Sequence, residues 1–235
     1  MPGSHAAPPS PVDDDPVERL FDGVREFRDN VFPERREQFE QLAKAQNPRI
    51  LFITCADSRV VPEMITQTEP GELFVCRNIG NIVPAYGEMM GGVSAVVEYA
   101  VVALGVTDIV VCGHSNCGAM AGLIRGDEAL NKMPTVRSWL RNAHAARSVV
   151  EVLHPELDGD DKIQALVEQN VVTQLQHLGT HPTVAAGVAS GKLELHGWVY
   201  DIETGAIHLH DAAQGRMVPF EESQGNQALK RKAST

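Results

Sequence analysis

Short apolar runs separated by helical patterns constrain the fold of this chain more than any other feature. The runs "RILFIT", "ELFVC" and "TDIVVCG" (residues 49–54, 72–76 and 107–113) are almost continuously apolar, as strands covered on both faces are. Between the second and third runs, "GGVSAVVEYAVVALG" (91–105) repeats apolar residues at helical spacing and ends at a glycine. Strands that alternate with helices predict an α/β fold with a mostly parallel central sheet flanked by helices.

Later segments extend this sheet. "KLELHGWVYDI" (192–202) predicts a fourth parallel strand, and "AIHLHD" (206–211) predicts an antiparallel edge strand. Residues 134–150 and 161–178 repeat apolar residues at helical spacing and predict two further amphipathic helices. Ligand sites in such sheets lie at the carboxyl ends of the strands, so functional residues are sought there.

Two helices are predicted ahead of the first strand. Asp15 and Pro16 suit the cap and first position of a helix, and a second helix ends before Asn47 and Pro48. An apolar stripe runs along the first helix, formed by Val17, Leu20, Phe21, Val24 and Phe27. This stripe needs a surface to cover, so we expect an N-terminal helical arm that packs on a partner subunit.

Composition indicates an ordinary globular protein. The 235 residues are 43% hydrophobic and 22% charged, which is enough to bury a sizeable core. Residues 1–14 and 223–235 have the composition of unfolded chain. We therefore expect a disordered N-terminal extension, a single catalytic domain over residues 15–222 and a flexible C-terminal tail.

Charge and targeting patterns narrow the possible partners. A net charge of -11 argues against nucleic acid and anionic membranes, which require a basic face. No apolar run approaches the roughly 18 residues of a membrane span. The N-terminus has no secretory pattern, so we expect a cytoplasmic protein. Thiols stay reduced there, and the four cysteines are expected to be metal ligands, catalytic groups or core residues.

Three potential metal ligands fall at predicted strand ends. Cys55 follows the first strand, and His114 follows "TDIVVCG". Cys117 lies at the predicted start of the next helix, where the helix dipole favours a thiolate. Two thiolates and an imidazole suit Zn²⁺ and leave its fourth position open.

Simpler explanations exist for each of these residues. A lone His-x-x-Cys is more often coincidence, and Cys76 and Cys112, inside strand patterns, are expected to be core residues. Asp57 and Arg59 could form only a structural ion pair. A thiol redox module would need a C-x-x-C pair, which the sequence lacks. The zinc hypothesis is favoured because Cys55 and the segment from His114 to Cys117 each follow an independently predicted strand, and because Asp57 and Arg59 accompany Cys55.

The motifs that carry these residues resemble those of one enzyme family. "CADSRV", "GELFVCRNIGN", "VEYAVVALGV" and "CGHSNCGAM" occur in this order and resemble the β-class carbonic anhydrases, over about Val17 to about Ala212. The resemblance implies reversible hydration of CO₂ to bicarbonate and a proton by a zinc-bound hydroxide. It also implies that Cys55, His114 and Cys117 bind zinc, and that Arg59 holds Asp57, which orients the hydroxide.

The resemblance extends to substrate binding and assembly. It implies that Gln46 binds substrate and that Phe74, Ile79 and Tyr99 line the CO₂ site, partly from a neighbouring subunit. It therefore implies self-association as a dimer or higher. Phe52 stands where closed-site members carry a tryptophan, so the sequence is more similar to the plant-type, open-site subclass.

Three alternatives remain at this stage. The same ligands could serve a carbonyl sulfide or carbon disulfide hydrolase. The metal could be purely structural or regulatory, although the Asp57 and Arg59 pair argues against this. Asp57 could also bind zinc as a fourth ligand and close the site.

Overall fold

The structure is a computed structural model that describes residues 15–88 and 91–223. The predicted extension 1–14 and all but the first residue of the predicted tail 223–235 lie outside these residues. The chain divides into two compact units between Gln46 and Asn47. In the described part of the chain, no helix has the length and apolar character needed to cross a membrane.

The first unit is helical. It comprises α1 (Pro16–Glu26), the π-helical turn η1 (Phe27–Val31), α2 (Phe32–Glu34) and α3 (Arg36–Leu42). As predicted, the Asp15 carboxylate caps α1 by accepting a hydrogen bond from Val17 N at 2.9 Å. The rings of Phe27, Phe32 and Phe39 pack together with centroids 5.4–6.1 Å apart, and they link η1, α2 and α3.

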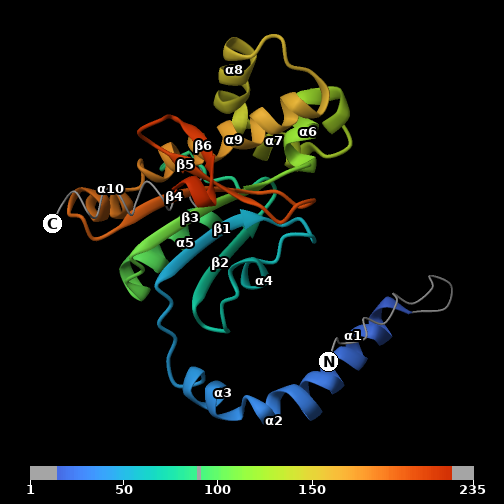
Figure 1. Cartoon of the computed structure of the whole chain (residues 1–235), viewed down its shortest axis with the longest axis vertical. Coiled ribbons are helices and arrows are strands. Elements are labelled where there is room, and N and C mark those ends of the chain that lie inside the picture. Colours follow the sequence, from blue (N-terminus) through green and yellow to red (C-terminus); the bar gives the residue numbers. More distant parts are fainter. Residues whose placement is uncertain (1–14, 89–90, 224–235) are drawn as a thin grey trace. The chain divides into compact units, whose positions relative to one another are not determined.

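The second unit is built on a six-stranded sheet (Figure 1). The strand order is β2-β1-β3-β4-β5-β6, and the first four strands are parallel. The last two are antiparallel. Their bounds are β1 Ile50–Cys55, β2 Leu73–Asn78, β3 Asp108–His114, β4 Glu194–Tyr200, β5 Ile207–Asp211 and β6 Arg216–Pro219. The four parallel strands and the antiparallel addition were predicted and are confirmed.

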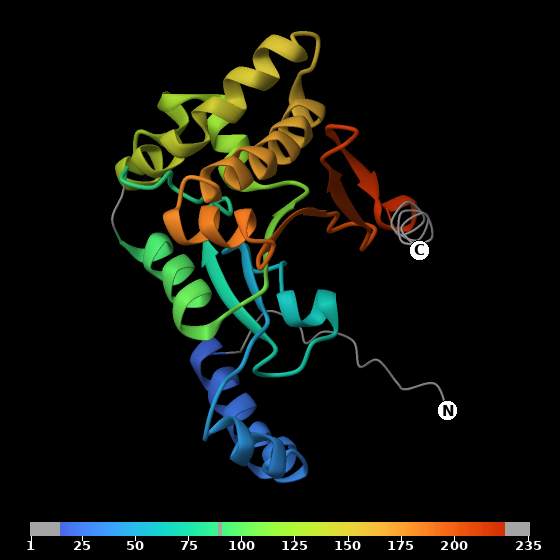
Figure 2. The ribbon, with the colours of Figure 1, turned by 90° about the vertical axis from the view of Figure 1, so that its left-hand side faces the viewer.

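Helices and short helical turns connect and cover the strands. Figure 2 shows α8 and α9, in yellow and orange, running beside each other above the sheet. The bounds are α4 Pro62–Thr66, α5 Gly92–Glu98, η2 Tyr99–Leu104, α6 Gly118–Arg125, η3 Asp127–Leu130, α7 Pro134–Leu140, η4 Arg141–Ala143, α8 His144–Leu153, α9 Gly159–Leu178 and α10 Pro182–Ala189. The predicted glycine stop is confirmed, since Gly105 ends η2 with φ +66°.

Both faces of the sheet carry buried apolar side chains. The larger core joins β1 residues Leu51 and Ile53 to helix residues Val97, Met120 and Val171. On the other face, Phe52, Val110 and Cys112 are buried, and Trp198 packs edge-on against Phe52. Alternate residues of one strand therefore enter different cores, which explains the nearly continuous apolar runs.

Several elements differ from the prediction. β5 is not the edge, because the short β6 pairs beyond it. The helix predicted over 134–150 is interrupted by η4, where the Asn142 side chain donates to Trp139 O at 2.8 Å. The sequence analysis also missed α4 and α10, which are only five and eight residues long. Short segments give too few periods for a reliable pattern.

Candidate metal centre

The three predicted ligands lie together at the carboxyl ends of the central strands. Cys55 is the last residue of β1, His114 is the last of β3, and Cys117 precedes α6. Because β1 and β3 are neighbouring parallel strands, their ends meet at one edge. The ligand atoms of all three residues lie within 4.8 Å of one another, and all three side chains are buried.

The imidazole of His114 is oriented as a metal ligand. Its Nδ1 lies 2.9 Å from the carbonyl oxygen of Ser115, which can only accept, so Nδ1 carries the proton. Nε2 therefore presents a lone pair, and this buried atom has no hydrogen-bond partner in the described residues. An unsatisfied buried nitrogen costs about 1–3 kcal/mol. A metal ion between Nε2 and the two sulfurs would remove this cost, so the residues fit a bound zinc ion.

The two cysteine thiols affect each other's ionisation. The hydrogen bond from the Cys117 thiol lowers the pKa of Cys55. The same bond, together with burial, raises the pKa of Cys117. Gly80 N also donates to Cys55 Sγ, at 3.4 Å. The pair thus favours a thiolate at Cys55, and a dication would favour loss of the second proton.

Asp57 and Arg59 form a two-fold ion pair beside these ligands. Arg59 Nε donates to Asp57 Oδ1 at 2.9 Å, and Arg59 Nη2 donates to Oδ2 at 2.8 Å. These hydrogen bonds from the guanidinium hold the pKa of Asp57 well below its usual range. Asp57 Oδ2 lies 3.9 Å from His114 Nε2. The carboxylate is therefore ionised, fixed in orientation and close to the ligand atoms.

Sequence reasoning missed a second arginine that fixes this turn. Arg77 Nη2 donates to the carbonyl oxygen of Asp57 at 2.6 Å, and its Nε donates to that of Cys55 at 3.2 Å. Arg77 lies on β2, the strand beside β1. It stands directly after Cys76 in "VCRN", and a lone arginine in a strand offers no pattern that would reveal this role.

An apolar cavity of about 410 Å³ opens beside the centre. Cys55 and Asp57 line one side of it, and the rest of the lining is mostly apolar and includes Ile79, Leu130, Val136 and Leu140. The Trp139 indole N–H donates to the carbonyl oxygen of Ile79 at 2.8 Å and fixes this part of the wall.

The other predicted substrate residues lie elsewhere. Phe74 and Tyr99 pack on each other with ring centroids 5.9 Å apart, and neither lines this cavity. Tyr99 is half-exposed and lines a separate cavity of about 360 Å³. Gln46 is the last residue of the first unit, so its place relative to the centre is not defined.

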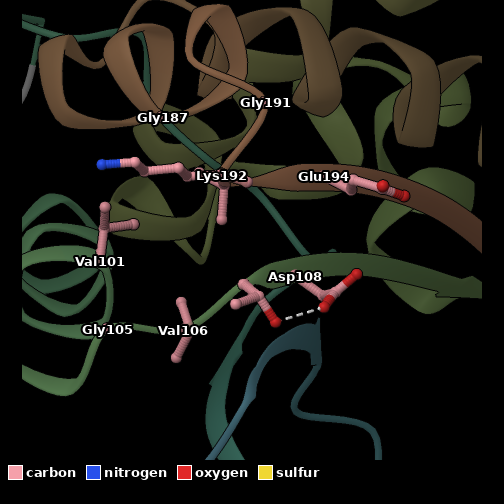
Figure 3. Close-up of a pocket in the computed structure, with 10 residues that line it drawn as sticks. Val101, Gly105, Val106, Asp108, Gly187, Gly191, Lys192 and Glu194 are labelled. Carbon is pink, nitrogen blue, oxygen red and sulfur yellow. Dashed lines mark hydrogen bonds between the residues drawn. The ribbon is translucent and has the colours of Figure 1, made fainter.

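A second group of potential ligands lies at the opposite ends of the strands. Asp108, Glu194 and His196 surround the amino ends of β3 and β4, next to a cavity of about 580 Å³. Figure 3 shows the carboxylates of Asp108 and Glu194 on one side of this cavity and the Lys192 amine on the other. His196 Nε2 lies 2.8 Å from Asp108 Oδ1, and Thr107 Oγ1 donates to Oδ2 at 2.7 Å. Both oxygens of the Asp108 carboxylate therefore have hydrogen-bond partners. His114 Nε2 at the other site has none among the described residues.

Comparison with known proteins identifies the family. Residues 50–207 match the carbonic anhydrase family. A carbonic anhydrase of Pseudomonas aeruginosa is 53% identical over 203 residues, which cover 86% of this chain and 91% of that protein. The solved structure of the β-carbonic anhydrase CcaA superposes with a TM-score of 0.85 and 46% identity, covering 86% of this chain and 91% of that one. This chain belongs to the β-class carbonic anhydrases. It is accordingly an enzyme of the carbonic anhydrase, or lyase, class.

A third relative supports the fold and is described as tetrameric. The structure of a tetrameric β-carbonic anhydrase from Sordaria macrospora superposes with a TM-score of 0.65 and 32% identity. The alignment covers 82% of this chain and 92% of the Sordaria chain. The β-class fold predicted from the sequence motifs is thereby confirmed.

Proposed function

We propose that this protein is a zinc-dependent carbonate dehydratase that interconverts CO₂ with bicarbonate and a proton. Cys55, His114 and Cys117 would hold the zinc ion. The observation that carries this proposal is the buried Nε2 of His114, which has no hydrogen-bond partner among the described residues and lies within 4.8 Å of two cysteine sulfurs. Bound zinc lowers the pKa of coordinated water toward about 7 and so supplies a nucleophile near neutrality.

Asp57 and Arg59 would orient the reacting water. The Asp57 carboxylate is ionised, lies beside the ligand atoms and can accept a hydrogen bond from an attacking water. Both Asp57 oxygens accept hydrogen bonds from Arg59. Because binding the metal directly would disturb these bonds, an orienting role for Asp57 is favoured over a role as a metal ligand. This arrangement supports our proposal that a bound zinc ion would keep a fourth position open, as in the plant-type subclass.

The substrate would approach through the apolar cavity. CO₂ is small and has no net dipole. A cavity lined by side chains such as Ile79, Leu130 and Val136 therefore admits CO₂ more readily than it admits ions from the surrounding solution. We propose that Phe74, Tyr99 and Gln46 complete substrate binding in the assembled enzyme. A purely structural zinc site would need neither this cavity nor an oriented carboxylate at its wall.

The decisive experiment compares two buried cysteines. In Cys55→Ala, zinc content and CO₂ hydration measured on one sample should both be lost. Cys76→Ala removes an equally buried thiol from the neighbouring strand and should retain both. Zinc binding without hydration of CO₂ in the wild-type protein would contradict the proposal. Assays of the same sample with carbonyl sulfide and carbon disulfide distinguish CO₂ hydration from the alternative hydrolase activity.

We also propose that the protein acts in the cytoplasm as a dimer or larger assembly, with residues 15–222 forming one catalytic domain. The exposed apolar stripe of α1 supports self-association, since Leu20 and Val24 are 69% and 63% exposed. The tetrameric assembly of the Sordaria macrospora relative supports it as well.

A further inference from the structure

We propose that Asn170 is a positioning residue for the metal centre and acts through the loop that holds Gly80. This inference rests on the proposed zinc site. Asn170 lies on α9, 90 positions from Gly80 in sequence, and its side chain is 1% exposed. Its hydrogen bonds go to Gly80 and Gln174, and it is not one of the residues that line the cavity, so its effect would pass through the backbone.

A continuous hydrogen-bonded path connects Asn170 to a ligand sulfur. Asn170 Nδ2 donates to the carbonyl oxygen of Gly80 at 3.0 Å. The N–H of the same glycine donates to Cys55 Sγ at 3.4 Å. Both peptide groups that flank the Gly80 Cα are thus engaged, one by the helix and one by the sulfur.

Gly80 joins the two peptide groups of this path in a conformation that suits glycine. Its φ of +78° lies in the left-handed region, which glycine adopts without strain. A Cβ at this position would meet Ala119 Cβ and Met120 Cε at 3.1 Å, so the backbone packs closely on α6. The Trp139 indole holds the Ile79 carbonyl, which belongs to the same peptide group as the Gly80 N–H. The bond from Asn170 holds the next peptide group, and the close packing on α6 limits rotation between the two, so both bonds contribute to the direction of the N–H.

A backbone group determines the orientation of the Asn170 amide. The N–H of Val83 donates to Gln174 Oε1 at 2.8 Å, which leaves Gln174 Nε2 to donate to Asn170 Oδ1, also at 2.8 Å. Asn170 must then present its NH₂ group to Gly80. Asn170 and Gln174 are almost fully buried, so water does not compete for these bonds.

The consequence concerns how strongly Cys55 holds a metal. A donor aimed at a thiolate stabilises its charge and fixes its position, and loss of such outer partners typically weakens metal binding about 10–100-fold. Asn170 does not bond to the sulfur itself but to Gly80, which does. We therefore expect loss of its donor to weaken zinc binding by about 10-fold, toward the lower end of that range.

The test uses three full-length variants. Asn170→Asp keeps the shape and the acceptor for Gln174 but removes the donor to Gly80. Thr173→Val is the matched control, because Thr173 is buried on the same helix and its hydroxyl donates to Gln169 O within α9. A buried aspartate at this position carries a charge that could prevent folding. If Asn170→Asp does not fold, the uncharged variant Asn170→Ser is used in its place.

Two readouts are measured on the purified proteins. Zinc affinity is determined by competition with a chelator, and the thiolate-to-metal charge-transfer band is recorded after loading with Co²⁺. We expect weaker zinc binding and a shifted band in the Asn170 variant, and wild-type values in Thr173→Val. Unchanged affinity and band in the Asn170 variant, or an equal loss in Thr173→Val, would overturn the inference. Failure of the wild-type protein to bind zinc at Cys55 would instead refute the proposed function.

Discussion

Asp57 owes its orientation to side chains that reach it from nearby. Its carboxylate is held at both oxygens by Arg59, and its carbonyl is held by Arg77. The carboxylate is only 18% exposed, so water competes weakly with these bonds. A charge-assisted, two-fold hydrogen bond of this kind is among the strongest available to a side chain.

We expect Asp57→Asn to reduce kcat/KM for CO₂ hydration by about 10–100-fold, because an amide can no longer accept through both oxygens or carry the negative charge. Zinc content should stay at the wild-type level, since Asp57 is not among the proposed ligands. Stopped-flow hydration assays and metal analysis of the same preparation test this. Loss of zinc in Asp57→Asn would show that the carboxylate binds the metal.

His210 links the pH of the solution to stability. Burial lowers the pKa of His210, and the nearby Asp211 charge offsets this only in part. The unfolded chain therefore takes up a proton at about pH 6.5, where the folded protein does not yet bind it. Stability from this residue is present above that pH and is lost as the pH falls.

Replacement by a residue that does not titrate should remove this dependence. We expect the free energy of unfolding to fall less between pH 7.5 and pH 5.5 in His210→Gln than in the wild-type protein. Urea denaturation at the two pH values measures the difference. Equal losses in both proteins would contradict the assignment.

At the scale of elements, α9 connects the sheet to the metal centre. It lies directly on β4, where a Cβ at Gly197 would be 2.9 Å from both Leu175 Cδ1 and Val171 Cγ1. The close approach is possible because glycine has no side chain at this contact. It also places Asn170 and Gln174 within reach of the loop after β2.

We expect Gly197→Ala to destabilise the protein by about 1–3 kcal/mol, because the added methyl group forces helix and sheet apart. Thermal or urea unfolding measures this. Gly92→Ala is the control, since a Cβ there meets nothing within 4 Å. Similar stability changes in the two variants would argue against close packing as the cause.

At the scale of the whole molecule, the outstanding feature is the uncovered stripe of α1. Val17 and Phe21 are 52% and 51% exposed, although the opposite side of the same helix is charged. An exposed apolar stripe of this length is unusual on an isolated soluble chain. A second copy of the chain is the partner that we propose.

We expect light scattering to give at least twice the mass of one chain. The double variant Leu20→Glu with Val24→Glu should lower that mass, because it places two charges within the stripe. Glu26→Lys, on the other side of α1, should not. A monomeric mass for the wild-type protein would exclude the proposed assembly.

The sequence by itself determined the sheet and the place of its ligands. Apolar runs such as Leu51–Thr54 could only be strands buried on both faces, and parallel strands bring their carboxyl ends to one edge. Cys55, His114 and Cys117 therefore could be grouped before any coordinates existed. Local patterns were sufficient because each ligand directly follows a strand or precedes a helix.

Only the tertiary structure decided what surrounds those ligands. Arg77 binds the carbonyls of Cys55 and Asp57, and Asn170 binds that of Gly80, yet neither partnership leaves a periodic trace in the sequence. Which side chain reaches a given backbone group depends on how closely a helix lies on the sheet, and this is set by packing at residues such as Gly197. At the break at η4, the local bond from Asn142 to Trp139 is joined by a contact distant in sequence, in which Gln174 Nε2 on α9 donates to Asn142 O at 3.4 Å. β6 has only four residues, too few for a periodic pattern.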